Sequence, residues 1–97
     1  MKLTSRSEYA LLALVHLARH ESEGYISTET IATAQHIPLK FLEQILFALK
    51  RAKHLRSAKG QHGGYQLAKP ASQISLAAVI RLFDGALAPK EPVSKYF

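Results

Sequence analysis

Cysteine is absent from this chain of 97 residues. Its absence excludes disulfide bonds, thiolate zinc sites, cysteine nucleophiles and cysteine-ligated iron–sulfur clusters within these residues. Long apolar runs are also absent: the longest, Tyr9–Val15, is far shorter than the ~20 residues that span a bilayer. No small-residue cleavage site follows it, so we do not expect a secretory signal. The sequence therefore predicts a cytoplasmic protein without a membrane segment.

Acidic residues are scarce in one third of the chain. Between Pro38 and Pro70, seven Lys and Arg residues accompany a single acid, Glu43, while the charges outside this window cancel. The window therefore carries the whole net charge of +6. Such a basic patch is typical of proteins that bind polyanions. The alternative is a solvated basic face that only keeps the protein soluble.

The first third of the chain predicts two helices in one small domain. The first helix begins after Thr4 or Ser5 and ends near His20, and apolar residues surround most of its circumference. Such a helix belongs in the middle of a core or at a subunit contact. Ser27 is a good N-cap for a second, brief helix that ends near Gln35.

A third helix is expected from about Leu39 to Lys53, because Pro38 favours a helix start. Its apolar residues recur at spacings of three and four and predict an inner face: Leu39, Leu42, Ile45, Leu46 and Leu49. At about 100° per residue, the opposite face carries Lys40, Glu43, Gln44, Phe47 and Arg51. Two short helices of this kind, joined by a tight turn, indicate a helix-turn-helix.

The next segment predicts a β-hairpin. Leu55–Ala58 and Tyr65–Ala68 alternate with period two, and the loop between them, Lys59–Gly64, contains three glycines and begins with a cation. The pattern therefore indicates two strands with a flexible, positively charged tip, which is the wing of a winged helix.

A fourth helix follows, capped by Ser75 and ended by Gly85. Its inward residues are expected to be Leu76, Val79, Ile80 and Phe83. The sequence thus predicts a mainly α winged helix-turn-helix domain over residues 1–85. Residues 86–97, with two prolines, are expected to form an extended tail.

Groups that could converge on a catalytic site are few, so we do not expect an enzyme. His16 and His20 have the spacing of a metal-binding pair, but the residues between them supply no third ligand, and surface or core histidines are favoured. The glycine-rich loop lies between two strands, not between a strand and a helix, and lacks the lysine spacing of a P-loop. His54 and His62 are expected to be exposed and to add charge below pH ~6.5. An enzyme or metal sensor built on the histidines is a further alternative.

The outer face of the third helix can read base edges in double-stranded DNA. Gln44 can pair with adenine and Glu43 can accept a hydrogen bond from cytosine. Lys40 and Arg51 can bind phosphate or guanine, and Lys59 would reach the backbone or the minor groove. Phe47 is open to two interpretations: its ring touches a thymine methyl, or it folds under and completes the core. The remaining candidate DNA-binding residues lie in the hairpin: Gly60, Gly63, Gly64 and Tyr65.

These segments resemble a known family. The N-terminal Met1–Arg6 with Tyr9-Ala10, the run Phe41–Leu46, and the hairpin from Lys59-Gly60 to Gly63–Ala68 are similar to the IscR/NsrR/RirA-type winged-helix transcription regulators, the Rrf family of bacteria. The similarity extends from about Met1 to Pro92. It implies a dimeric bacterial repressor or activator, with repression expected, that inserts its third helix into the major groove. It also implies base reading by Glu43 and Gln44 and operator contacts from Lys40 and Lys59.

The chain departs from many of these relatives in its last residues. They carry three cysteines that hold an iron–sulfur cluster, whereas Pro92 stands where the first would be expected. We therefore expect no cofactor in this chain, which is either a truncated or a cluster-free member. His36 occupies a turn position where the family usually has glycine, and histidine tolerates a left-handed backbone better than most residues. The alternative function is a winged helix that docks an acidic protein partner through its basic face.

Overall fold

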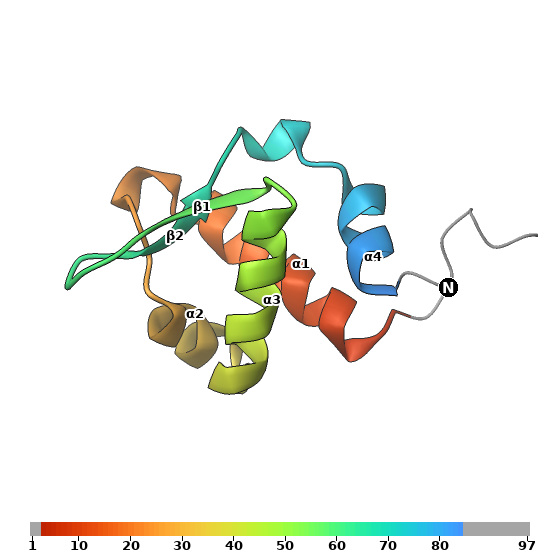
Figure 1. Cartoon of the computed structure of the whole chain (residues 1–97), viewed down its shortest axis with the longest axis horizontal. Coiled ribbons are helices and arrows are strands. Elements are labelled where there is room, and N and C mark those ends of the chain that lie inside the picture. The colour runs from red at the N-terminus through yellow and green to blue at the C-terminus, as the bar shows by residue number, and fades with distance from the viewer. Residues whose placement is uncertain (1–2, 85–97) are drawn as a thin grey trace, which may run out of the picture.

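The computed structural model describes residues 3–84 (Figure 1). The described elements, in chain order, are α1 (Ser5–Arg19), the 3-10 helix η1 (Glu21–Glu23), α2 (Thr28–Gln35), α3 (Leu39–Arg51), β1 (Leu55–Ala58), β2 (Gly64–Leu67), the 3-10 helix η2 (Ala71–Gln73) and α4 (Leu76–Asp84). The predicted stop at Gly85 and the extended tail 86–97 lie outside the described residues. The mainly α winged helix-turn-helix fold is confirmed.

Serine and threonine side chains fix the starts of three helices, as the sequence predicts. The Thr4 hydroxyl accepts a hydrogen bond from the Ser7 amide at 3.3 Å, and Ser27 accepts one from the Thr30 amide at 3.1 Å. Ser75 accepts one from the Ala78 amide at 3.1 Å. Each bond satisfies an amide that has no partner within its own helix.

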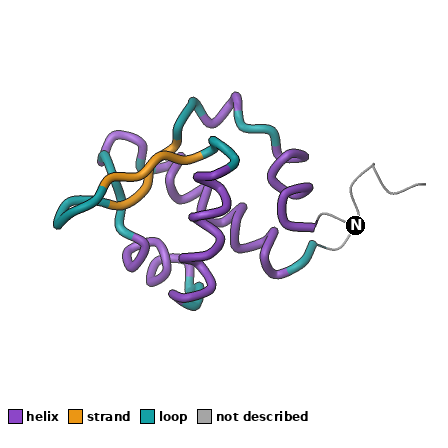
Figure 2. Tube along the Cα trace, viewed as in Figure 1, coloured by secondary structure: helices purple, strands orange, loops and turns teal. Residues whose placement is uncertain are grey.

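The core lies between α1 and α3, with α2 and α4 packed against them (Figure 1). Ile31 on α2 and Val79 on α4 contribute from the other helices, and the hairpin adds Leu55 and Leu67 at its base. The strands pair antiparallel, with Leu55 opposite Leu67 and Ala58 opposite Gly64. The hairpin then projects from the side of the molecule opposite α4 (Figure 2). The base of the hairpin is therefore held by the core, whereas the tip of the hairpin does not contact the described core.

The turn between α2 and α3 is left-handed at His36, with φ 56° and ψ 45°. The next amide, on Ile37, donates to the Ala32 carbonyl at 3.0 Å and so closes the end of α2. Ile37 itself is buried. The tight turn expected at His36 is confirmed, and it sets the angle at which α3 follows α2.

Helix α3 ends at Arg51, two residues before the expected end at Lys53. Lys53 adopts a left-handed conformation with φ 72° and donates to the Lys50 carbonyl. The His54 amide then donates to the Leu49 carbonyl, which completes a Schellman motif. Lys53 occupies the left-handed position where glycine is usual. Because lysine does not signal a helix end, the helical periodicity predicts a helix that is two residues too long.

The exposure of two leucines and the bounds of the second strand differ from what the sequence predicts. Leu39 is 40% exposed because, at 100° per residue, it lies at the edge of the apolar stripe beside Glu43. Leu76 is 60% exposed at the first position of α4, whereas Val79 is fully buried and Ile80 and Phe83 are half-buried. Strand β2 is shifted by one residue, because Gly64 pairs with Ala58 and belongs to the ladder.

Candidate nucleic-acid interface

The outer face of α3 consists of the five residues that the sequence places there, and all five are exposed: Lys40, Glu43, Gln44, Phe47 and Arg51. The opposite face is fixed by Leu42, Ile45, Leu46 and Leu49, each with no exposed surface. A helix held so firmly on one side presents its other side in a defined orientation. We call these five exposed residues the outer face of α3.

Phe47 does not complete the core. Its side chain is 53% exposed, and it is absent from the half-buried apolar residues that pack against the core in residues 3–84. The Arg51 guanidinium lies 5.9 Å from the centre of its ring, one helical turn further on. Of the two interpretations that the sequence left open, folding under is therefore wrong.

The tip of the hairpin brings Lys59 and Gly60 into solvent. Gly60 has φ +101°, a backbone conformation that residues other than glycine rarely adopt. The Gly63 amide donates to the Gly60 carbonyl at 3.0 Å and closes the loop. A cation on such a short, exposed loop can move toward a ligand without disturbing the strands.

Gly63 and Gly64 have a structural role at the base of the tip. A Cβ atom on Gly64 would lie 2.1 Å from the Ile26 carbonyl oxygen, and one on Gly63 would lie 2.2 Å from that of Ala58. Both positions therefore require glycine because another backbone approaches closely. Both also line the polar hollow beside the wing, and a contact with DNA at these positions stays a prediction.

Tyr65 ties the wing to the rest of the domain. Its amide donates to the Ile26 carbonyl at 2.8 Å, and the Ile26 amide donates to the Tyr65 carbonyl at 2.9 Å. The ring is half-buried against the core. Burial raises the pKa of the Tyr65 hydroxyl, and the negative charge of Glu43 raises it further. The charge of Glu43 on α3 therefore acts on the hydroxyl of Tyr65 on β2.

The basic residues of the window are not neutralised by ion pairs within residues 3–84. Arg56 instead donates to the Gln66 side chain across the hairpin, at 2.8 Å. A polar hollow of about 530 Å³ lies between the wing and the start of α2, and its wall includes Lys50, Lys59 and Thr28. Lys50 was not among the candidate site residues, because the helical pattern does not place it on the outer face of α3. It lines the same hollow as Lys59 only because the hairpin folds back beside α3.

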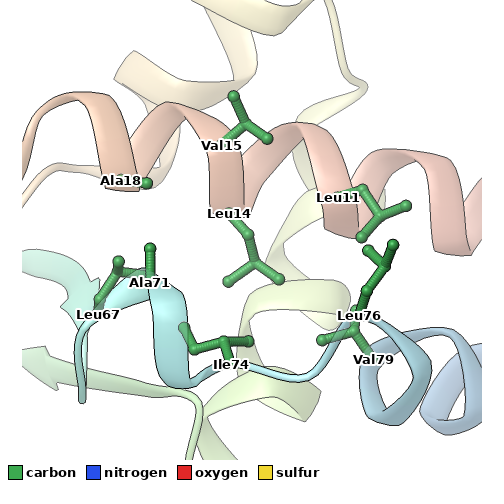
Figure 3. A pocket seen from close by; sticks show the side chains of 9 residues that line it. All are labelled: Leu11, Leu14, Val15, Ala18, Leu67, Ala71, Ile74, Leu76 and Val79. Atoms are coloured by element: carbon green, nitrogen blue, oxygen red, sulfur yellow. The ribbon is translucent and has the colours of Figure 1, made fainter.

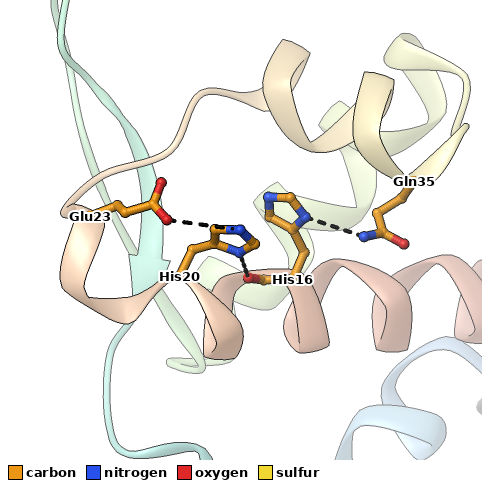
Figure 4. A network of polar contacts seen from close by, with 4 residues as sticks. All are labelled: His16, His20, Glu23 and Gln35. Carbon is orange, nitrogen blue, oxygen red and sulfur yellow. Dashed lines mark hydrogen bonds and ion pairs between the residues drawn. The ribbon is translucent and has the colours of Figure 1, made fainter.

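His16 and His20 on α1 pack against each other. His16 is buried and His20 stacks on it with ring centres 4.3 Å apart (Figure 4). The Gln35 amide lies 3.2 Å from His16 Nδ1, so His16 is a core histidine with a polar partner, as favoured from the sequence. Burial lowers its pKa, and the His20 charge lowers it further, while Glu23 acts in the opposite sense. No group of three potential metal ligands occurs in residues 3–84.

His54 was expected to be exposed, and that prediction is wrong. Its side chain is 7% exposed, behind the turn that closes α3. Desolvation lowers its pKa, and the nearby Lys69 charge adds to the shift. His62, at the tip of the wing, is exposed as expected.

Among the described residues, no helix has the length and apolar character needed to cross a bilayer.

Comparison with known proteins agrees with this geometry. The family model Rrf2, described as an iron-dependent transcriptional regulator, matches residues 3–95. The protein rrf2 of Nitratidesulfovibrio vulgaris is 41% identical over 91 residues, which are 94% of this chain and 61% of that protein. The chain spans between 51% and 64% of the lengths of the first curated relatives that it matches.

Solved structures of the same fold agree as well. The structure of T. potens IscR matches with a TM-score of 0.81 and 32% identity, over 99% of this chain and 70% of that one. The structure of CymR, the global cysteine regulator of B. subtilis, matches with a TM-score of 0.85 and 29% identity, over 96% and 72%. On the strength of the family match over nearly its whole length, this chain belongs to the Rrf2 family of transcriptional regulators.

Proposed function

We propose that this protein is a sequence-specific regulator of transcription that binds double-stranded DNA. The observation that carries the proposal is the exposure of the outer face of α3 and of the wing tip, whose cations have no ion-pair partners within residues 3–84. Cations without protein partners can neutralise phosphates, which supply most of the affinity of proteins for DNA. The family names agree with this function.

Each part of the surface has a separate task in this proposal. The outer face of α3 lies in the major groove, where Glu43 and Gln44 meet base edges. Lys40 and Arg51 contact phosphate or guanine, and Lys59 meets the sugar–phosphate backbone or the minor groove. Lys50 joins Lys59 at the hollow between the wing and α2. Repression follows where the bound protein occupies a promoter.

A homodimer is part of the proposal. An apolar groove of about 160 Å³ runs between α1, η2 and α4 (Figure 3). Leu11, Val15 and Leu76 line it, and Val15 and Leu76 remain 47% and 60% exposed. Leu12 on the same helix is 41% exposed. Of the two places expected for so apolar a first helix, a subunit contact accounts for these side chains, and we propose a second copy as the occupant.

The residues of this chain do not fit an iron-dependent mechanism. The chain has no cysteine, and residues 3–84 bring no three histidine or carboxylate ligands together. We therefore propose that these residues bind DNA without a metal or cluster and have no catalytic activity. The proposed place of action is the cytoplasm, where the bacterial chromosome lies.

Retardation of random duplex DNA at two salt concentrations tests the proposal. If a dimer neutralises about six phosphates, log affinity falls with log salt at a slope near −5, roughly 0.9 per phosphate. Failure to bind duplex even at low salt would contradict DNA binding. It would favour docking of an acidic protein partner through the same basic face.

A further inference from the structure

Phe47 is an apolar side chain on an otherwise polar surface. It stands among Lys40, Glu43, Gln44 and Arg51 on the outer face of α3, and 53% of it is exposed. The described core does not use its ring, as the packing of residues 3–84 demonstrates. Single apolar residues on a protein surface are common. This one, however, lies on the same face as the residues proposed to read bases.

The position of Phe47 along α3 defines what it can reach. It follows Gln44 by three residues and Glu43 by four. At 1.5 Å per residue these steps are about 4.5 and 6 Å along the axis, which is one to two base-pair steps of 3.4 Å. A ring at this height faces the major groove next to the bases met by Gln44.

The neighbour of Phe47 favours a nucleic-acid ligand. The Arg51 guanidinium lies 5.9 Å from the ring centre and has no ion-pair partner in the described part of the chain. A cation over an aromatic face restricts the ring and is itself free to meet a phosphate. An apolar protein partner would instead have to desolvate this guanidinium, at considerable cost.

The major groove offers one apolar group to a side chain of this kind, the C5-methyl group of thymine. We propose that Phe47, steadied by Arg51, is a specificity-determining residue that selects a thymine one or two base pairs from the base read by Gln44. This inference rests on the proposed function. It goes further by assigning a defined chemical group on the DNA to a residue that neither hydrogen-bonding pattern nor charge would select.

Replacing thymine by deoxyuridine removes that methyl group and leaves every hydrogen-bonding group in place. The parent protein is first used to select its preferred site from a random duplex pool. Each thymine of that site is then replaced singly by deoxyuridine, and the affinity of each duplex is measured. We expect one position in each half-site to lose about fourfold in affinity, as expected for one buried methyl-sized group. All other positions should change little.

Two variants assign the effect to Phe47. With Phe47→Ala, the thymine and deoxyuridine duplexes should bind equally well at that position, whereas Phe47→Leu should retain part of the discrimination. Leu82→Ala is the matched control, because Leu82 is a 41% exposed apolar residue on α4. It should keep the full fourfold loss.

The outcomes separate this inference from the proposed function. A parent protein that selects no motif would contradict sequence-specific DNA binding itself. A parent that selects a motif but tolerates deoxyuridine everywhere would overturn only the role of Phe47. That role is also overturned if Phe47→Ala keeps the full deoxyuridine penalty. It is overturned as well if Phe47→Ala binds every duplex as the parent does, which would indicate a ring that faces a protein partner.

Discussion

The two faces of α3 share one backbone and differ in almost every other respect. Leu42, Ile45, Leu46 and Leu49 have no exposed surface, while the outer face carries two cations, an acid, an amide and an exposed ring. The residues of the inner face are fully buried in the core, and they therefore stabilise the fold. The outer face contributes little to the described core, so its chemistry is free to serve a ligand.

Substitutions on the inner face of α3 should affect folding, and substitutions on its outer face should affect binding. A change on the inner face removes buried area and leaves a cavity. A change on the outer face falls on side chains already in water, where most substitutions alter stability by less than about 0.5 kcal/mol. Folding and binding can therefore be perturbed separately, and the largest effect is expected from the inner face.

Truncation of a buried side chain on the inner face should cause the largest loss of stability. We expect Leu46→Ala to lower the free energy of unfolding by about 2–5 kcal/mol, because Leu46 is completely buried. Gln44→Ala, two residues earlier on the outer face, is the control and should change it by less than about 0.5 kcal/mol. Urea unfolding followed by circular dichroism measures both. Similar losses in the two variants would mean that the faces are not distinct.

The wing provides the second prediction. Gly64→Val should destabilise the domain by about 1–3 kcal/mol, because the new Cβ would meet the Ile26 carbonyl oxygen and the φ of +147° resists a side chain. Ser57→Val places the same side chain on the paired strand, where the backbone already carries a Cβ, and is the control. If thermal unfolding finds both variants as stable as the parent, the close approach of Gly64 to Ile26 is wrong.

The sequence predicts the elements of this fold better than their ends. The periodicity of α3 and the glycines of the hairpin are local signals, and both elements are present. The end of α3 depends on Lys53 in a left-handed conformation, for which lysine gives no signal. The burial of His54 depends on the turn formed there. Such features arise from the path of the chain rather than from the residue type.

In the candidate site, too, some features follow from local sequence signals and others depend on the path of the folded chain. The outer face of α3 could be predicted from helical geometry alone, and its residues are exposed as expected. The hollow that Lys50 and Lys59 both line could not be predicted, because it forms only where the folded hairpin, α3 and the start of α2 meet. The effect of the Glu43 charge on the pKa of Tyr65 likewise joins two segments far apart in sequence. Their roles in DNA binding remain predictions.

Acidification should act on the buried side of the domain. The folded-state pKa of His16 is lowered, chiefly by burial, from an ordinary value of 6.5. The unfolded chain therefore binds the proton more readily, so stability is complete above pH 6.5 and falls as the pH drops below it. The slope for each such group is at most about 1.4 kcal/mol per pH unit. His54, whose pKa is lowered in the same direction, adds to the loss.

Unfolding free energies measured between pH 7.5 and pH 5 test this dependence. His16→Gln should remove part of the slope and leave the part that belongs to His54. His62→Gln, at an exposed histidine of the wing, is the control. An identical slope in the parent and in His16→Gln would contradict the assignment of His16 as a neutral core histidine.

The smallest effect is expected from the wing tip. Lys59→Ala should leave the fold intact, because Lys59 is exposed and has no ion-pair partner in residues 3–84. It should weaken binding to specific and random duplexes by similar factors and reduce the salt slope by about one per subunit. Retardation assays at several salt concentrations measure the slope. A loss confined to the specific duplex would mean that Lys59 reads bases.

Sequence reading by the outer face of α3 is tested most directly by selection of binding sites from a random duplex pool by the parent, Glu43→Ala and Gln44→Ala. We expect Gln44→Ala to lose about 1–3 kcal/mol on the preferred site, as for one bidentate base contact, with little change on random DNA. Glu43→Ala should bind random DNA equally well or slightly more tightly, because an acid repels phosphate, and should relax the preference at one or two base pairs. If all three proteins recover the same motif with the same preference at every position, the outer face of α3 does not read the DNA sequence.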